Sequence, residues 1–425
     1  MPDFLVPFNY DRVRDVLNRF TTYTYYQADG AKYIRAVLQE CYPCIFKHMD
    51  YKTFANGAIM FELSGANATE PLVFLAHADA PTPTITSSKY AENMNVSLSR
   101  AHLIALLEAL EELLKEGYRP SSDLFLCLSM DALSGGMGAV DMATHLRVRK
   151  IKPCFVLGQG GYMSKDAFRK FLPSDASLAL IGIAEKGLIE GSLIADEALM
   201  PVRNYGRVRP LHTLVLRGAR FVRFPRKTRL SPASQKMLLA LSKRAAFFRK
   251  QLTTYSTLSF PILCLIWRRR SVLKQFFQSE LAIYAMKAEG EPLRAAKKAW
   301  FGFRQTLLPG QSVTHAKEKL KRVANHRGLQ LDFSLACEAS PESEAKGEAW
   351  EALETAIEIQ FERAVIVPCL SPFSTDARYF TELSSKVYRF SPFWVTGTEA
   401  LCTECTINDD ILRKAVQFFR AMLSV

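Results

Sequence analysis

Apolar segments of strand length alternate with segments of helix length through the first 190 residues of this 425-residue chain. The residues expected to form strands are 58–63, 71–77, 123–130, 154–157 and 178–184, and those expected to form helices are 10–20, 31–41, 100–116 and 136–146. The segment 100–116 carries leucines on one face and places Glu111 four residues before Lys115. Strands alternating with helices form crossover units, so the pattern predicts an α/β fold with a largely parallel sheet covered on both faces.

This alternation stops after Gly187 and returns only near Leu335. Between residues 191 and 335 the chain holds 28 Lys or Arg against 7 Asp or Glu, whereas the remainder is mildly acidic although the whole chain carries a net charge of +13. Two later segments, 364–369 and 386–390, are again expected strands, and 410–423 is expected to be a closing helix. We therefore predict an α/β core of residues 1–190 and 336–425, with an inserted basic α+β lid of residues 191–335.

The composition is that of a folded protein, since 48% of the residues are hydrophobic and 23% are charged. The N-terminal residues contain neither a basic region nor a sustained apolar stretch, so we expect no secretory signal. Nine cysteines, an odd number scattered along the chain, favour reduced thiols. The longest apolar run, 258–267, has about half of the ~20 residues that span a membrane. These features predict a cytoplasmic protein.

Polar residues follow several of the expected strands at their carboxyl ends. His77 and Asp79 follow the strand 71–77, Asp131 follows the next, and Gly158 to Gly161 follow 154–157. Asp376 lies beyond the late strand. Ligands of open α/β sheets bind in the crevice at the carboxyl ends of the strands. We therefore expect a crevice lined by these residues.

Seven segments of the chain occur in an order and spacing that resemble a known enzyme family. They read LAHAD (75–79), IALLEALEELLKEG (104–117), SGGMGA (134–139), GG (160–161), AEKG (184–187), FR with LPG (303–304, 308–310) and STDARYF (374–380). Together they resemble the metallopeptidase family of carboxypeptidase S and the N-fatty-acyl amino acid hydrolases, relatives of aminoacylase and carboxypeptidase G. The resemblance implies an α/β core that holds two zinc ions and an inserted lid that often dimerises.

The resemblance also implies which positions should hold zinc, and most of them carry residues that cannot. His77 matches the first ligand, and Asp79 the carboxylate that orients it. The other matched positions are Leu98 for the bridging Asp, Ala132 and Leu133 for the general base and the next ligand, Gly158 for a further Asp, and about Leu401 or Cys402 for a final His. Without a bridging anion, two close dications repel each other. We predict no bound zinc and no other cofactor, with His77, Asp79 and Asp131 as vestiges of the site.

The leading functional hypothesis is a catalytically inactive family member, which binds a small amide or acyl-amino-acid ligand or forms a homodimer through the lid. Arg304 matches a family arginine. We interpret it as a candidate to bind the ligand carboxylate, the alternative being that it pairs with a carboxylate of the protein itself. On this hypothesis the chain is more an interaction protein than an enzyme.

Two alternatives stay open. In the first, a remodelled hydrolase uses a single-metal site assembled from His77, Asp79, Asp131, Gln159, Cys402, Glu404 and Cys405; the simpler interpretation is that His77 and Asp79 form a hydrogen-bonded pair. In the second, the basic lid binds an anionic membrane surface, with the segment 260–267 dipping into the interface. No recognisable nucleic-acid module is present, so we expect no nucleic-acid partner.

Overall fold

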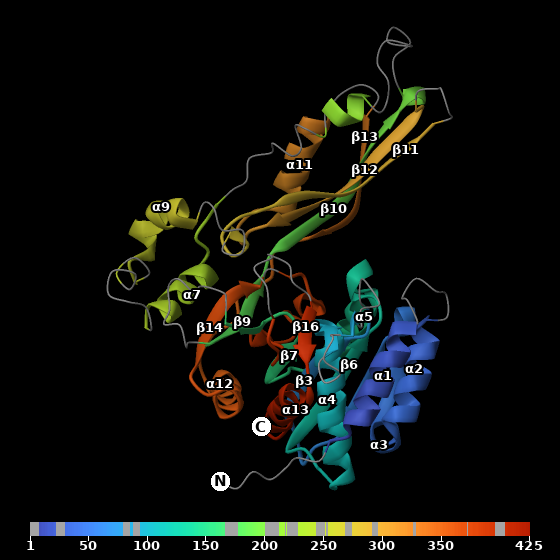
Figure 1. Cartoon of the computed structure of the whole chain (residues 1–425), viewed down its shortest axis with the longest axis vertical. Helices are drawn as coiled ribbons and strands as arrows, with labels where there is room; N and C mark the ends of the chain where they lie inside the picture. The colour runs from blue at the N-terminus through green and yellow to red at the C-terminus, as the bar shows by residue number, and fades with distance from the viewer. Residues whose placement is uncertain are drawn as a thin grey trace.

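The computed structural model describes most of the chain. The described residues are 8–22, 30–79, 86–87, 94–165, 177–199, 212–216, 218, 228–243, 251, 254–267, 274–290, 296–325, 329–371, 373–395 and 404–425. They form a lower body, which holds the first and last helices, and an upper body built on a separate sheet (Figure 1).

The lower body is built on a mixed sheet of nine strands, here called the core sheet. Its order is β1 (Asp50–Thr53), β2 (Ile59–Leu63), β6 (Ser122–Ser129), β3 (Asn67–His77), β7 (Phe155–Gly158), β15 (Val387–Arg389), β9 (Ser177–Glu185) and β14 (Ala364–Ser371), with β8 (Tyr162–Ser164) beside β9. β3 runs parallel to β6 and β7, and β14 runs parallel to β9. The predicted α/β fold with a largely parallel mixed sheet is confirmed.

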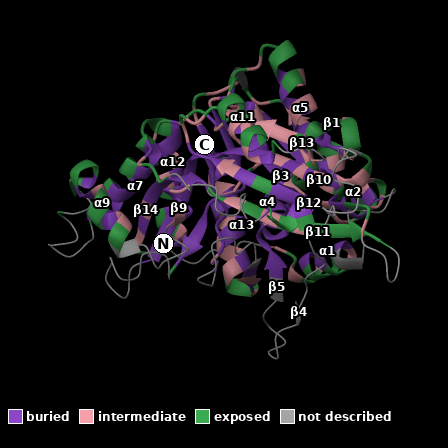
Figure 2. Ribbon diagram, turned by 90° about the horizontal axis from the view of Figure 1, so that it is seen from above, coloured by how far each residue is buried: buried purple, intermediate pink, exposed green. Residues whose placement is uncertain are grey.

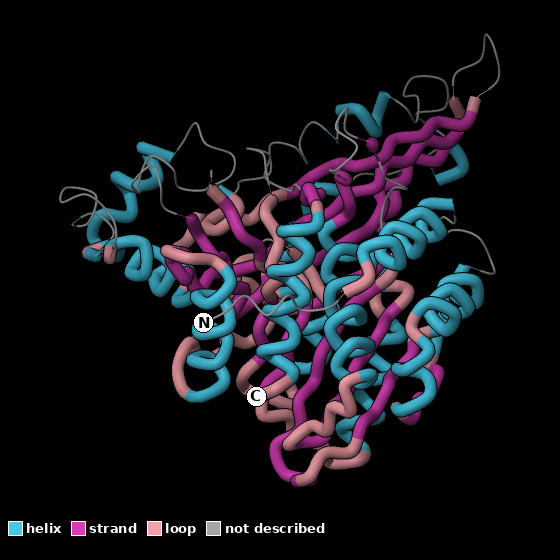
Figure 3. Tube along the Cα trace, turned by 60° about the horizontal axis from the view of Figure 1, so that its bottom comes forward, coloured by secondary structure: helices cyan, strands magenta, loops and turns pink. Residues whose placement is uncertain are grey.

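Helices cover both faces of the core sheet, as Figure 3 shows. Along β3, Phe74 belongs to one apolar cluster while Val73 and Leu75 belong to another, because successive strand residues point to opposite faces. The first cluster includes residues of α1 (Tyr10–Thr22), α2 (Gly30–Cys41), α3 (Pro43–His48), α4 (Leu98–Lys115), α12 (Glu348–Gln360) and α13 (Asp409–Leu423). The second includes α5 (Met137–Val148) and the short helix η5 (Asp376–Phe380). In Figure 2 most of the core strands have the colour of buried residues.

The upper body contains a four-stranded antiparallel sheet, here called the lid sheet. Its order is β11 (Leu281–Glu289), β12 (Lys298–Leu307), β10 (Gly187–Asp196) and β13 (Leu329–Cys337). Only Lys186 separates β9 of the core sheet from β10, so the two sheets are joined by nearly continuous strand. α11 (Val313–Ala324) packs on one face of the lid sheet through Ala316, Leu320 and Ala324.

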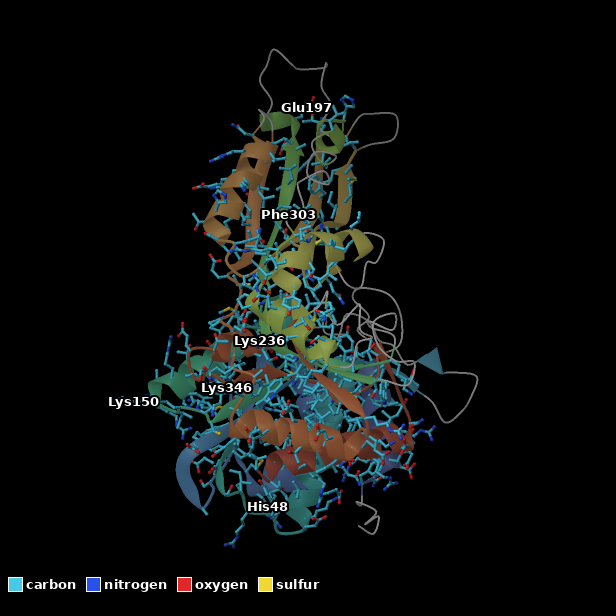
Figure 4. The ribbon with its side chains drawn as sticks, turned by 90° about the vertical axis from the view of Figure 1, so that its left-hand side faces the viewer. His48, Lys150, Glu197, Lys236, Phe303 and Lys346 are labelled. Carbon is cyan, nitrogen blue, oxygen red and sulfur yellow. The ribbon has the colours of Figure 1, made fainter. Side chains whose placement is uncertain are left out.

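Two further helices, α7 (Pro232–Ser242) and α9 (Ser256–Trp267), lie between β10 and β11 in sequence. α7 packs against β14 of the core sheet, and Lys236 of α7 pairs with Glu342 at 2.5 Å. Figure 4 shows Lys236 at the level where the two bodies meet and Phe303 within the upper body. The predicted boundaries at residues 190 and 335 stay a prediction, and part of the inserted segment lies against the core.

Candidate functional site

His77 lies at the carboxyl end of β3 and contacts two polar side chains. Its Nδ1 is 2.9 Å from Asp79 Oδ1, and its Nε2 is 3.1 Å from Ser99 Oγ, at the start of α4. Asp79 also accepts a hydrogen bond of 2.7 Å from the backbone N–H of Leu133 through its second oxygen. Both ring nitrogens of His77 and both oxygens of Asp79 therefore have partners within the protein.

Two more segments meet at the same edge of the core sheet. Gln159, which follows β7, donates from Nε2 to the carbonyl of Ser99 at 3.0 Å. Leu98 is buried immediately before Ser99, and Leu133 follows β6. The structure thus brings together the segments that the sequence places after β3, β6 and β7 and at the start of α4.

The pair formed by His77 and Asp79 is shielded from solvent and mutually stabilised. Burial alone would lower the pKa of His77, but the adjacent Asp79 carboxylate more than offsets this and the net pKa is raised. Burial alone would raise the pKa of Asp79, and the His77 ring and the Leu133 amide reverse that shift, so the net pKa is lowered. The geometry is that of a hydrogen-bonded pair at a strand end.

Asp131 lies apart from that pair and holds the backbone of its own loop. Its Oδ2 accepts 2.7 Å from Asn56 Nδ2, and both carboxylate oxygens accept from the backbone N–H of Gly138 at 3.2 to 3.3 Å. These contacts join the turn after β6 to the start of α5 and to the short helix before β2. Both carboxylate oxygens of Asp131 therefore have hydrogen-bond partners within the protein, and its position is explained without a bound ligand.

Asp376 begins η5 and faces the core. Its carboxylate accepts a hydrogen bond from Ser129 Oγ at the end of β6. Burial raises the pKa of Asp376 to about 6, and the nearby His77 opposes that rise. Asp376 therefore connects η5, which follows β14, to the edge of the core sheet where His77 lies.

A buried ion cluster that the sequence did not reveal lies at the end of β9. Glu185, fully buried, pairs with Arg378 at 2.8 Å and with Arg389, and accepts 2.8 Å from the backbone N–H of Thr375. Burial alone would raise the pKa of Glu185, but the two guanidinium groups lower it overall. The motif at 184–187 includes Glu185, but a single sequence contains no signal that its partners are the arginines 193 and 204 residues away.

A cavity of about 440 Å³ lies between the lid sheet and this edge of the core sheet. Its lid wall includes Lys186, Glu190, Glu280 and Arg304, and its core wall includes Leu133, Phe373, Asp376 and Arg378. Arg304 of β12 pairs with Glu190 of β10 at 2.6 Å, and the Arg304 side chain is about half exposed. Burial lowers the pKa of Lys186 to about 8.

The residues around His77 do not fit a pair of zinc ions. Leu98, Ala132, Leu133 and Gly158 offer no side-chain donor, although a zinc site needs three or four N, O or S ligands. Within the described ranges, no three His, Cys, Asp or Glu side chains are grouped so as to hold a metal ion. Leu401 and Cys402 lie outside the described residues.

The closing segment that the single-metal hypothesis requires does return to this edge. β16 (Glu404–Ile407) pairs antiparallel with β5 (Met94–Ser97), and Glu404 is opposite Ser97, just before Leu98. Cys405 is buried in that strand. Cys402 lies in the segment 396–403, which the structure does not describe.

Comparisons with known proteins agree with the fold described above. A model of peptidase family M20/M25/M40 matches residues 96–424. The chain is 23% identical over 391 residues to N-fatty-acyl-amino acid synthase/hydrolase PM20D1 of Homo sapiens, covering 87% of this chain and 76% of that protein. It is 21% identical over 387 residues to probable carboxypeptidase S-like 2 of Dictyostelium discoideum, covering 85% of this chain and 72% of that protein.

Solved structures show the same fold. The M20 family metallo-carboxypeptidase Sso-CP2 of Sulfolobus solfataricus superposes with a TM-score of 0.66 at 13% identity, covering 97% of this chain and 98% of that one. The di-peptidase Dug1p of Saccharomyces cerevisiae gives a TM-score of 0.67 at 10% identity, covering 97% and 94%. The resemblance found in the sequence motifs is confirmed: this chain belongs to peptidase family M20/M25/M40.

Proposed function

We propose that this chain is a family member without hydrolytic activity, and that it binds a small amide or acyl-amino-acid-like ligand between the lid sheet and the core. The proposal rests on the surroundings of His77, which is the one family ligand matched in the described residues. Both of its ring nitrogens contact Asp79 and Ser99, and the side chains at the other matched positions are aliphatic or absent. No general base stands at Ala132, and loss of such a group costs roughly 10²–10⁴-fold in rate.

The composition of the cavity wall supports a ligand that is both charged and apolar. Cations at Lys186, Arg304 and Arg378 stand beside carboxylates at Glu190 and Glu280. A larger apolar set, including Leu133, Leu188, Leu335 and Phe373, forms the rest of the wall. The buried Oε1 of Gln275, which also lines the cavity, has no hydrogen-bond partner in the described structure. It offers an acceptor to an amide N–H of the ligand.

Metal analysis combined with a turnover assay tests the absence of hydrolysis. We expect purified protein to contain no stoichiometric zinc and to leave a panel of N-acyl amino acids and dipeptides intact. Zinc retained through dialysis, together with turnover that His77→Ala abolishes, would instead favour the remodelled single-metal hydrolase. Turnover that persists in His77→Ala would contradict both views of the site.

Calorimetric titration with the same N-acyl amino acids tests ligand binding. We expect binding to weaken roughly tenfold in Arg304→Gln, because a cation in the cavity wall is lost. Arg19→Gln is the matched control, since Arg19 also pairs with a carboxylate, Glu40 at 2.7 Å, but lies on α1, far from the cavity. Equal affinity in Arg304→Gln and Arg19→Gln would remove Arg304 from the proposal.

Peripheral attachment to an anionic membrane is a second candidate, which an exposed stripe on α9 favours. Leu258, Ile262 and Leu265 of α9 and Tyr255 just before it recur at spacings of three and four residues on the solvent side, and Leu258 is 83% exposed. Leu263 on the opposite side is buried. From Ala198 to Ser279 the chain has 18 Lys or Arg and no Asp or Glu, and a sequence of this charge suits an anionic surface. No helix in the described ranges combines the length and hydropathy of a membrane-spanning segment.

Cosedimentation with vesicles tests this attachment. We expect the protein to bind phosphatidylcholine vesicles that contain phosphatidylserine, and to be released by high salt because screening weakens surface electrostatics. Leu258→Glu with Leu265→Glu should abolish binding, whereas Ile359→Glu, a comparably exposed position on α12, should not. Absence of binding at low salt would eliminate the membrane candidate.

A further inference from the structure

A second cavity, of about 670 Å³, lies on the far side of the lid sheet from the cavity described above. One wall is α11, the floor is the end of β12, and the opposite wall comes from Thr228, Arg229 and Ser279. Its volume lies within the range of about 300–1,000 Å³ that small-molecule sites occupy.

β12 separates the two cavities through the alternation of its side chains. Arg304 and Thr306 line the cavity that faces the core, whereas Gln305 and Leu307 line the one beneath α11. Successive residues of a strand point to opposite faces, so the two cavities are distinct sites on opposite sides of one sheet.

The cavity beneath α11 is lined by three cationic side chains, Arg229, Lys319 and Arg322, and by His315. His315, Lys319 and Arg322 are spaced by four and three residues, which places them on one side of the helix. Arg229 faces them from the opposite wall, where its guanidinium lies against Gly310. None of the lining residues is acidic, and within the described part of the chain no carboxylate forms an ion pair with Arg229, Lys319 or Arg322.

A buried polar group without a partner faces this cavity. Gln305 is only 5% exposed, and its Oε1 makes no hydrogen bond among the described residues. The two ends of a glutamine amide are interchangeable by rotation, so Gln305 can present either an acceptor or an N–H donor to a ligand. A buried amide left unsatisfied is costly, so Gln305 is suited to form a hydrogen bond with a polar group of a ligand in this cavity.

Apolar side chains complete the lining. Leu307, Ala316 and Val323 also line the cavity, so it offers apolar contact as well as charge. The amino end of α11 is already occupied, because Glu338 accepts 2.9 Å from the backbone N–H of Val313. The cationic character therefore comes from side chains and not from the helix terminus.

From these observations we propose that the cavity beneath α11 binds an amphiphilic organic anion, in which a carboxylate or phosphate monoester is attached to a short aliphatic body. The cations of α11 and Arg229 hold the anionic group, Gln305 donates or accepts a hydrogen bond, and the aliphatic part contacts Leu307 and Val323. This binding does not depend on the function proposed for the cavity that faces the core.

Isothermal titration with soluble, monomeric octanoate and octyl phosphate tests the proposal, with octanol as the uncharged analogue. We expect at least one of the two anions to bind, and the comparison between them identifies which anionic group is preferred. Octanol should bind roughly tenfold more weakly or not at all, because it lacks the charge.

The test variant is Lys319→Gln with Arg322→Gln, and the control is Lys321→Gln, an exposed lysine of α11 outside the cavity. We expect roughly tenfold or greater loss of affinity in the double variant and none in the control. Arg229→Gln, on the opposite wall, is an independent variant that should also weaken binding. Gln305→Leu should do so as well, because it removes the amide.

Three outcomes would overturn the proposal. The first is that neither anion binds, and the second is that octanol binds as tightly as they do. The third is that Lys321→Gln weakens binding as much as the double variant, which would show a general effect of net charge. Circular dichroism and thermal melts of each variant establish that the fold is unchanged.

Discussion

Glu185 and Asp376 are two buried carboxyl groups at the same edge of the core sheet, and their pKa values shift in opposite directions. Glu185 contacts Arg378 and Arg389, which outweigh burial and lower its pKa. Asp376 has a serine hydroxyl as its hydrogen-bond partner, so burial prevails and its pKa rises to about 6. The number of cationic partners, more than burial itself, decides the direction in which the pKa of each carboxyl group shifts.

We predict that Glu185→Gln destabilises the protein by about 3–5 kcal/mol at pH 7, because it leaves two buried guanidinium groups without their anion. The lowered pKa means that this contribution is present above the ordinary glutamate pKa and is lost as the pH falls through the folded-state value. The difference between wild type and variant in urea unfolding should therefore shrink below about pH 4. Glu382→Gln, whose side chain is 73% exposed and pairs with Arg147, should cost less than about 1 kcal/mol.

Substitution of Lys186 is predicted to stabilise the protein, in contrast to substitution of Glu185. Its ammonium group is buried, donates to the carbonyl of Gln278 at 2.9 Å, and has its pKa lowered to about 8 by burial. Below that pH the folded protein has to keep a buried charge, so Lys186→Met should raise the free energy of unfolding by about 1–3 kcal/mol at pH 7.

That gain should shrink above pH 8, where the folded lysine loses its proton and the unfolded one keeps it. Urea unfolding at two pH values measures it, with Lys346→Met as an exposed control. A wild-type protein that is more stable than Lys186→Met at pH 7 would contradict the argument.

At the scale of elements, the helices and strands that sequence period predicts for the core are present, whereas the core helices α3 and α12 were not predicted. The segment 100–116 is a helix as predicted, but α4 is buried on nearly all sides and not only along its leucine face. Its glutamates therefore have partners that helix spacing does not predict. Glu111 lies 3.9 Å from Lys115, but its two oxygens accept 3.2 and 3.1 Å from the backbone N–H groups of Cys44 and Ile45, at the start of α3.

We predict that Glu111→Ala lowers the free energy of unfolding by about 2–3 kcal/mol, because two amide groups at the start of α3 lose their acceptor in a buried setting. Chemical denaturation measures the change. Glu116→Ala, at the end of the same helix, removes a partly exposed pair with Arg420 and should cost less than about 1 kcal/mol. Similar losses in the two variants would show that Glu111 acts only as a surface charge.

The same limit applies to the candidate site. The positions of His77, Asp79 and Asp131 were predicted from the ends of the expected strands, because the end of a strand is determined by the local sequence. The pairing of His77 with Ser99, and of Glu185 with arginines from β15 and η5, depends on how distant segments meet. Helical or strand periodicity in one sequence holds no information about such contacts.

At the scale of the whole molecule, the predicted domain boundaries stay a prediction, and the bounds of the lid sheet are known from the structure. β10 begins at Gly187 and β13 ends at Cys337. The packing of α7 against β14 was not predicted, since composition reports the charge of a segment and not the surface that it covers. The cytoplasmic location stays a prediction.

The predicted homodimer also belongs to this scale. β11 and β13 are the outer strands of the lid sheet, and outer strands present backbone groups that a second copy can pair with. Light scattering should give about twice the monomer mass of 47.9 kDa. Tyr284→Lys with Met286→Lys, both exposed on β11, should return it to the monomer value, whereas Ile359→Lys on α12 should not. A monomer at all concentrations would refute the dimer.

On the two binding proposals made above, β12 contacts both ligands, because its side chains alternate between the two cavities. Arg304 and Thr306 line the cavity that faces the core, and Gln305 and Leu307 line the cavity beneath α11. A ligand in one cavity that displaces the backbone of β12 therefore changes the shape of the other cavity. Thermodynamic linkage requires the effect to be reciprocal, with each occupant changing the affinity of the other by the same factor. The lid sheet would then couple ligand binding in one cavity to ligand binding in the other, without any chemical reaction.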